Sequence, residues 1–230
     1  MLAIPQHIER SGVRNQPVGY TWRGDADYNR ESRALSEKLH AMSRRASLAC
    51  AASMTQWGVA RLQHLSDFQA PQQMIEAAWA ANVHPLYCKI PAVYEFNERK
   101  GPVDGVLRIF KDLLEDVIRR YDTPNGMNVP GGTVYVYFLA RHVMPDKKPF
   151  DKWLKWAIER MIALYPFSRD DPIGEPIPHE ALDPDFDFRK EEAPELLNEF
   201  MRGLDPSTNH YLRTPDEMVA DGFQGTPYSV

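Results

Sequence analysis

The stretch that decides the fold runs from Ser32 to Leu65 and reads SRALSEKLHAMSRRASLACAASMTQWGVARLQHL. Its apolar and small residues recur every three or four positions, at Leu35, Leu39, Met42, Ala46, Ala49, Ser53 and Trp57. This is the period of one face of an α-helix. Midway the face narrows to small side chains, which lets a neighbouring helix approach closely. We therefore predict the central helix of an all-α domain, extending from Tyr28 to Leu65.

Other segments carry helical signals of their own. One helix is expected from Pro71 until Pro85 ends it, and another from Pro102 to Tyr121, where a wide apolar stripe faces a charged one. Further helices are expected at residues 149–165 and 194–201. A last short helix begins at Thr214, whose spacing to Glu217 is that of a capping box, and ends at Gly222.

The run TVYVYFLARHVM, residues 133–144, has an ambiguous composition. Its first half is rich in β-branched and aromatic residues, as in a strand, but its length suits a buried helix. An isolated strand would leave its backbone without partners. We therefore predict a helix here.

Length and composition predict one domain with appendages. A chain of 230 residues that is 43% hydrophobic can bury a full core without a disulfide or metal to hold it. Glycine and proline divide it into an irregular N-terminal arm (residues 1–26), a helical core (27–165) and an acidic, proline-rich C-terminal segment (166–230). Short helices of that last segment are expected to pack on the core.

The charge is unevenly distributed along the chain. Residues 166–230 contain 15 Asp and Glu against 5 Lys and Arg, whereas the residues before them contain 17 against 22. Such asymmetry is typical of an acidic interaction segment, although a solvated segment laid over a helical body has the same composition. Of these two interpretations, the interaction segment makes the more specific prediction, namely a protein partner with a basic surface.

The two cysteines, Cys50 and Cys88, lie in predicted helical segments, where a thiol is usually a small buried hydrophobe. A single disulfide between them remains an alternative. No signal-peptide pattern opens the sequence, and no run of eighteen apolar residues occurs. These features predict a cytoplasmic protein without a membrane partner.

The candidate motifs for metal and nucleotide binding lack residues that the chemistry of those sites requires. Asp183, Asp185 and Asp187 alternate as in a calcium loop, but Phe188 stands where an EF-hand needs Gly, and Pro194 where it needs Glu. We interpret this segment as a turn whose two phenylalanines, at 186 and 188, pin it to the core. The glycines at 126, 131 and 132 lack the Lys and Ser or Thr of a phosphate loop.

The histidines and nucleophiles form no catalytic pattern. No two of the seven histidines lie four residues apart, and neither cysteine has the surroundings of a known nucleophile. We expect no bound metal, no cofactor and no catalytic residue. An enzyme whose site is assembled from dispersed residues is an alternative, with these candidates: His84, His142, Glu76 and Glu115.

Basic residues mix with aromatic ones in KKPFDKWLKW, residues 147–156. Acidic neighbours dilute this charge, and the aromatic positions follow a core stripe. We predict a core helix with a lysine-rich outer face rather than a nucleic-acid platform. Arg44 and Arg45 are interpreted as a solvated helix face.

Two segments resemble a known kind of protein. Ser43 to Lys89 contains an Arg-Ala-Ser-Leu-Ala stretch followed by a Trp and a Glu-Ala-Ala-Trp helix, and it is similar to helical proteins encoded beside secreted antibacterial toxins. Ala193 to Tyr228 is similar to the tails of such proteins. The resemblance implies an immunity protein, a non-enzymatic inhibitor that binds its cognate toxin in the producing cell.

An inhibitor of this kind needs a rigid scaffold, a surface complementary in charge and a few aromatic anchors. The predicted partner-binding residues are Asp183, Asp185, Glu191, Trp22, Tyr211, Phe223 and Tyr228. A scaffold or phage-type assembly subunit is a further alternative, which a symmetric apolar patch would favour. The sequence decides neither the toxin's identity nor the oligomeric state.

Overall fold

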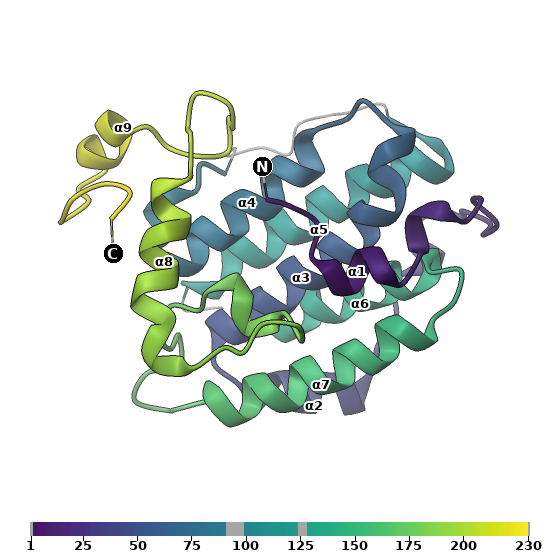
Figure 1. Ribbon diagram of the computed structural model, residues 1–230, viewed down its shortest axis with the longest axis horizontal. Coiled ribbons are helices and arrows are strands. Elements are labelled where there is room, and N and C mark those ends of the chain that lie inside the picture. Colours follow the sequence, from purple (N-terminus) through teal and green to yellow (C-terminus); the bar gives the residue numbers. More distant parts are fainter. Residues whose placement is uncertain (1, 91–98, 124–127, 230) are drawn as a thin grey trace.

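The computed structural model describes residues 2–90, 99–123 and 128–229 (Figure 1). Over these residues the chain is an all-α domain of packed helices, and its β-pairing is limited to two isolated bridges. Among the residues described, none of the helices combines the length and apolar character that crossing a bilayer requires.

Helix α3 (Arg44–Leu62) is the centre of the fold. Every residue from Ala46 to Leu62 is buried, so this helix has no solvent-facing side beyond its first turn. It packs against α4 (Ala70–Val83), α5 (Val106–Tyr121), α6 (Val129–Val143) and α7 (Lys148–Leu164). The prediction of an all-α domain around this helix is confirmed.

The prediction of one continuous helix from Tyr28 to Leu65 is wrong. The structure has α2 (Arg33–His40), then a break, then α3. At the break Met42 forms an antiparallel bridge with Pro166, and the Ser43 side chain accepts a hydrogen bond from the Ala46 amide, which caps α3. The apolar period continues through the break because Met42 is itself buried.

The other predicted helices are confirmed. The ambiguous run at 133–144 lies in α6 except for its last residue. The lysines at 147, 148, 152 and 155, at the start of α7 and within it, are all exposed. The segment before α5 starts with a π-helical turn, Gly101–Gly105. Near the C-terminus the chain forms α8 (Ala193–Arg202) and α9 (Pro215–Ala220), the second with the predicted capping box.

The N-terminal arm is more ordered than its composition suggests. It contains α1 (Gln6–Arg10) and short 3-10 turns at Val13–Asn15 and Gly24–Asp27. Ile8 and Val13 are buried, so the arm is part of the core. In Figure 1, α1 crosses in front of α3, and α8 stands along one side of the molecule.

The prediction that Arg44 and Arg45 form a solvated helix face is wrong, because both guanidinium groups donate to backbone carbonyls of other segments. Arg44 donates to the Thr123 carbonyl at 2.9 Å, and Arg45 donates to the Val83 carbonyl at 2.9 Å. Arg45 also donates to the carbonyl of Gly174. Their guanidinium groups therefore satisfy backbone acceptors of segments distant in sequence.

Both cysteines are buried free thiols, so the alternative of a disulfide between them is excluded. Burial raises the pKa of the Cys50 and Cys88 thiols to about 12. A thiol with so high a pKa is a poor nucleophile at neutral pH. Both are therefore packing residues.

Candidate functional site

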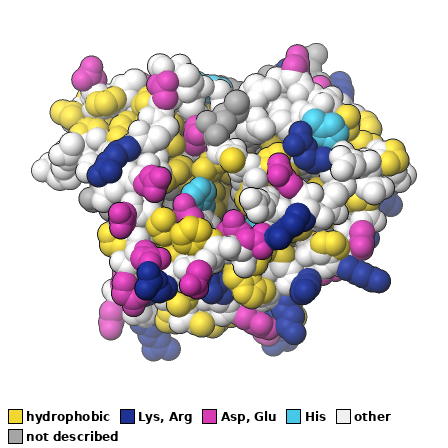
Figure 2. Space-filling view, in the orientation of Figure 1, with side chains coloured by type: hydrophobic (Ala, Val, Ile, Leu, Met, Phe, Trp, Pro, Cys, Tyr) yellow, Lys and Arg dark blue, Asp and Glu magenta, His cyan; other side chains and the backbone are white. Residues whose placement is uncertain are grey.

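A pocket of about 340 Å³ opens where α1, α3 and α7 meet the C-terminal segment. We call it the α1 pocket. Figure 2 shows this face of the molecule, where acidic side chains are interspersed with hydrophobic ones. The pocket is lined by Ala3, Ile4, Pro5, Gln6, His7, Ile8, Ser53, Gln56, Trp153, His179, Glu180, Leu182, Asp183 and Phe186.

His7 is the most enclosed polar side chain of α1. Its ring lies 6.0 Å from the ring of Trp153, nearly parallel to it, and 5.7 Å from that of Trp57. Nδ1 is 3.2 Å from the Asp183 Oδ1 atom. An ionised carboxylate only accepts hydrogen bonds, so Nδ1 carries the proton in the neutral ring. Burial lowers the pKa of His7 from its ordinary 6.5, although Asp183 opposes that shift.

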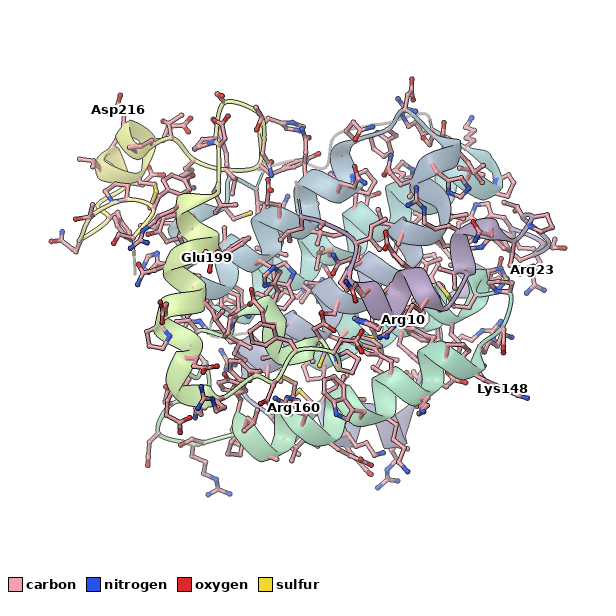
Figure 3. The ribbon with its side chains drawn as sticks, viewed as in Figure 1. Arg10, Arg23, Lys148, Arg160, Glu199 and Asp216 are labelled. Atoms are coloured by element: carbon pink, nitrogen blue, oxygen red, sulfur yellow. The ribbon has the colours of Figure 1, made fainter. Side chains whose placement is uncertain are left out.

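The acidic turn that follows is tied to α1. Asp183 accepts a hydrogen bond from the Asp185 amide at 3.0 Å, and the Asp185 carboxylate pairs with Arg10. Figure 3 labels Arg10 on α1. The turn role that we predicted for this segment is confirmed, with His7 and Arg10 as its anchors.

These residues also form a group with metal-ligating atoms. Among the described residues, one such group is found, in which the ligand atoms of His7, Asp183 and Asp185 lie within 4.8 Å of one another. Arg10 already supplies a cation to Asp185, and Asp183 already accepts two hydrogen bonds. The prediction that the protein binds no metal stays a prediction.

A second imidazole and carboxylate lie across the pocket, in the 3-10 turn His179–Leu182. The His179 Nδ1 and Glu180 Oε2 atoms are 2.6 Å apart, but the contact lacks hydrogen-bond geometry. Glu180 Oε2 is thus a buried acceptor without a hydrogen-bond donor among the described residues. The Trp153 indole donates to the Leu182 carbonyl at 3.1 Å and fixes this turn.

The two phenylalanines of the segment behave differently. Phe188 is buried, and the Arg160 guanidinium lies 5.6 Å from its ring. Phe186 is 40% exposed and lines the pocket, so the prediction that it is pinned to the core is wrong. The Phe188 amide donates to the Phe186 carbonyl at 2.9 Å, so the backbone turns tightly between the two rings, with Phe188 in the core and Phe186 at the pocket wall.

The predicted aromatic anchors lie apart from the pocket lining. Tyr211, expected to be exposed, is only 1% exposed, and the Lys111 ammonium lies 5.7 Å from its ring centre. Trp22 is half-buried and stacks on Tyr28. Phe223 and Tyr228 are half-buried against the ring of Tyr87, at centroid distances of 5.4 and 5.2 Å.

Of the predicted acidic residues, Asp183 lines the pocket and Asp185 lies beside it in the same turn. Glu191 is exposed immediately before α8. The structure therefore places the predicted acids and the predicted aromatic residues in different parts of the molecule, with Trp22 in the N-terminal arm. It brings neither set together as a single patch.

The four dispersed catalytic candidates each have polar partners of their own. His84 Nδ1 accepts from the Leu86 amide, and His142 Nε2 is 3.0 Å from the Thr21 carbonyl oxygen. Glu76 accepts from Asn209, and Glu115 pairs with Lys111 at 2.6 Å. The contacts of His84, His142 and Glu76 fix loops and helix ends, and the Glu115–Lys111 pair lies within α5, so each residue has a structural role.

Sequence reasoning missed most of the α1 pocket. His7 and Asp183 are separated by 176 positions, and His179 has no sequence neighbour that marks it. A spacing motif detects residues on one helix or loop, whereas this pocket joins the two ends of the chain.

Comparison of the chain with family models, with curated proteins and with solved structures finds no match in any of the three. Function is therefore inferred from the chain's own residues. The pocket combines apolar walls with carboxylates and a neutral imidazole, an arrangement suited to binding a cation that has an apolar stem.

Proposed function

We propose that this protein is a non-enzymatic immunity protein that binds a cognate toxin and neutralises it through a surface complementary to a basic region of that toxin. The observation that supports this most directly is an acidic ridge along α8. Glu195 and Glu199 lie one turn apart on the same side of α8, Glu191 lies in the 3-10 turn immediately before this helix, and all three are exposed. Figure 3 labels Glu199 on this helix.

The acidic ridge is held in place by the opposite side of α8, where Leu197 and Met201 are buried. Nearby acidic residues are ion-paired, since Glu192 pairs with Arg189, and Glu175 pairs with Lys190. No ion pair is recorded for the three ridge carboxylates in the described parts of the chain. Uncompensated charges on a rigid element attract an oppositely charged partner over a distance and need no ordering when it binds.

A self-associating scaffold subunit has less support. A closed oligomer needs a self-complementary, usually apolar, surface. Among the described residues, the large hydrophobic side chains that are well exposed belong to separate segments: Leu65, Phe167, Phe186 and Val219. They make no shared apolar face on one element.

The test is a growth assay with the toxin encoded beside this gene, expressed alone and together with this protein, followed by isolation of the complex. We expect co-expression to restore growth and the two proteins to purify together. Absence of both protection and complex would refute the proposal.

Charge reversal then locates the surface. Asp183 and Asp185 are unsuitable for this, because they also hold α1 through His7 and Arg10. The triple variant Glu191→Lys, Glu195→Lys and Glu199→Lys should slow association and reduce its salt dependence, with helical content unchanged. A matched control reverses three exposed acids elsewhere, Glu31, Glu159 and Asp170. If both triple variants weaken toxin binding equally, binding depends only on net charge and the acidic ridge is not the toxin-binding surface.

A further inference from the structure

The α1 pocket has the size and walls of a site for one side chain or a small molecule. Its volume of about 340 Å³ lies at the lower end of the range for ligand pockets. Ile8 and Leu182 are buried apolar residues of its lining, and Phe186 adds a partly exposed ring. Such walls accommodate an aliphatic stem or a flat group.

The polar part of the pocket is anionic. Asp183 and Glu180 contribute carboxylates to its lining, and Arg10 neutralises the adjacent Asp185. His7 does not offset this charge at neutral pH, because burial lowers its pKa. A cation is therefore the complementary ligand.

Three buried polar atoms of the pocket lining have no hydrogen-bond partner among the described residues: His7 Nε2, His179 Nδ1 and Glu180 Oε2. The His7 side chain is only 10% exposed, and its Nε2 atom has no hydrogen-bond partner among the described residues. Glu180 Oε2 lies 2.6 Å from His179 Nδ1, but that contact lacks hydrogen-bond geometry. Buried polar atoms in native proteins are nearly always paired, so His7 Nε2 and Glu180 Oε2 indicate that a hydrogen-bond donor is supplied from outside the chain.

We infer that the α1 pocket receives the guanidinium group of an arginine side chain presented by the bound partner. This inference rests on the proposed function for the identity of that partner. A guanidinium has five N–H donors in one plane, which suits two separated carboxylates better than the single point charge of an ammonium. Its flat face stacks on an aromatic ring, and Phe186 provides one at the pocket wall.

The chemistry of the pocket favours a guanidinium over a metal ion. Asp183 Oδ1 already accepts from His7 and from the Asp185 amide, and Asp185 is paired with Arg10. A metal ion would have to displace these donors, whereas a guanidinium can donate to Glu180 Oε2, which accepts no hydrogen bond from the described residues, and lie on the ring of Phe186.

The probe for this inference is agmatine, which carries a guanidinium on an aliphatic chain. It is titrated into the full chain at pH 7.5 and constant ionic strength, while NMR follows the ring resonances of His7 and His179. We expect the ring resonances of both histidines to shift and the shift to saturate. Glu180→Gln should weaken agmatine binding about tenfold, the loss typical of one charge-assisted hydrogen bond.

Phe186→Ala provides an independent variant that does not disturb the core. It should weaken agmatine binding roughly threefold, as expected for a cation–π contact at a partly exposed ring. Phe167→Ala is the matched control, since Phe167 is 47% exposed and lies outside the pocket lining. That control should bind agmatine as the wild type does.

Three results would overturn the inference. The first is the absence of a saturable shift, and the second is equal binding of n-butylamine, which has an ammonium in place of the guanidinium. The third is competitive binding of Zn²⁺ that improves in Arg10→Gln, which would identify a metal site instead.

The agmatine titration requires no toxin, so the two proposals fail separately. Saturable agmatine binding without a toxin complex would refute the immunity function and leave the guanidinium pocket standing. A toxin complex without agmatine binding would refute the pocket alone. If the agmatine complex and the toxin complex both form, Phe186→Ala should raise the Kd of the toxin complex while Phe167→Ala leaves it unchanged.

Discussion

The ring of Phe110 on α5 lies directly against the backbone of Gly58 on α3. A Cβ atom built on Gly58 would stand 2.0 Å from Phe110 Cζ, far inside van der Waals contact. Both residues are buried, and the glycine lies in the interior of the longest helix. Glycine weakens a helix interior, so its use here is explained by the close approach of α5.

Gly58→Ala should destabilise the protein by about 1 to 3 kcal/mol through overpacking, even though alanine is the better helix former. The free energy of unfolding from urea denaturation measures this. Gly131→Ala is the matched control, because nothing lies within 4 Å of a Cβ at that helical position. It should leave stability unchanged or raise it by up to about 1 kcal/mol. Destabilisation by both variants would contradict the explanation.

Phe110→Leu should reduce the damage done by Gly58→Ala, because the ring that meets the new methyl group is then absent. Residues in direct contact give non-additive changes in unfolding free energy, commonly between about 0.5 and 3 kcal/mol. Simple additivity of the two single variants would show that the ring does not cause the effect.

Asn82→Ala should release the start of the C-terminal segment. Asn82 is fully buried, donates to the Arg45 carbonyl at 2.8 Å and accepts from the Ile177 amide at 2.8 Å. Two buried backbone groups would lose their partners, at about 1 to 3 kcal/mol each. Hydrogen exchange at the Ile177 amide should accelerate markedly. Asn29→Ala, at an exposed asparagine, should change neither exchange nor stability.

Stability should fall as the pH drops below 6.5, partly because of His7. Its pKa is lowered in the folded protein by burial, so the unfolded chain takes up a proton first. The contribution is complete above pH 6.5 and is lost as the pH falls toward the lower, folded value. His64 and His84 act in the same direction, because burial lowers their pKa as well. His7→Phe should flatten the dependence without abolishing it, whereas an unchanged profile would contradict the role of His7.

Glu115→Ala should be among the most destabilising single changes. Glu115 is fully buried and pairs with Lys111, which is itself 3% exposed, and with Arg119. Removing one member of a buried ion pair leaves an uncompensated charge and typically costs about 3 to 5 kcal/mol. Thermal unfolding of this variant is compared with that of Glu159→Ala, which removes an exposed acid of α7, and the comparison measures the difference in stability. Equal effects would mean that the buried pair adds nothing to stability.

The helices were largely predictable because their signals are local. Apolar residues at intervals of three and four mark α5 and α7, and proline marks several helix starts. The break between α2 and α3 was not predictable, since Met42 keeps the apolar period while its backbone pairs with Pro166. A backbone bridge to a residue more than a hundred positions away cannot be detected in a short window of sequence.

The α1 pocket was predictable only in part. The alternating aspartates drew attention to Asp183 and Asp185, but no pattern indicated that His7 would lie beside them. The exposure of Phe186 and the burial of Tyr211 also depend on tertiary packing. Hydrophobicity alone does not tell which of several aromatic side chains of an irregular segment will face the core.

The 176 positions between His7 and Asp183 have a consequence for biosynthesis. A ribosome releases α1 early, yet that helix waits for most of the chain to emerge before the acidic turn reaches it. Closing so long a loop is entropically unfavourable until the helices between have assembled. A nascent or truncated chain that stops before residue 183 therefore lacks part of the α1 pocket, and ligand binding there would report that synthesis has passed the acidic turn.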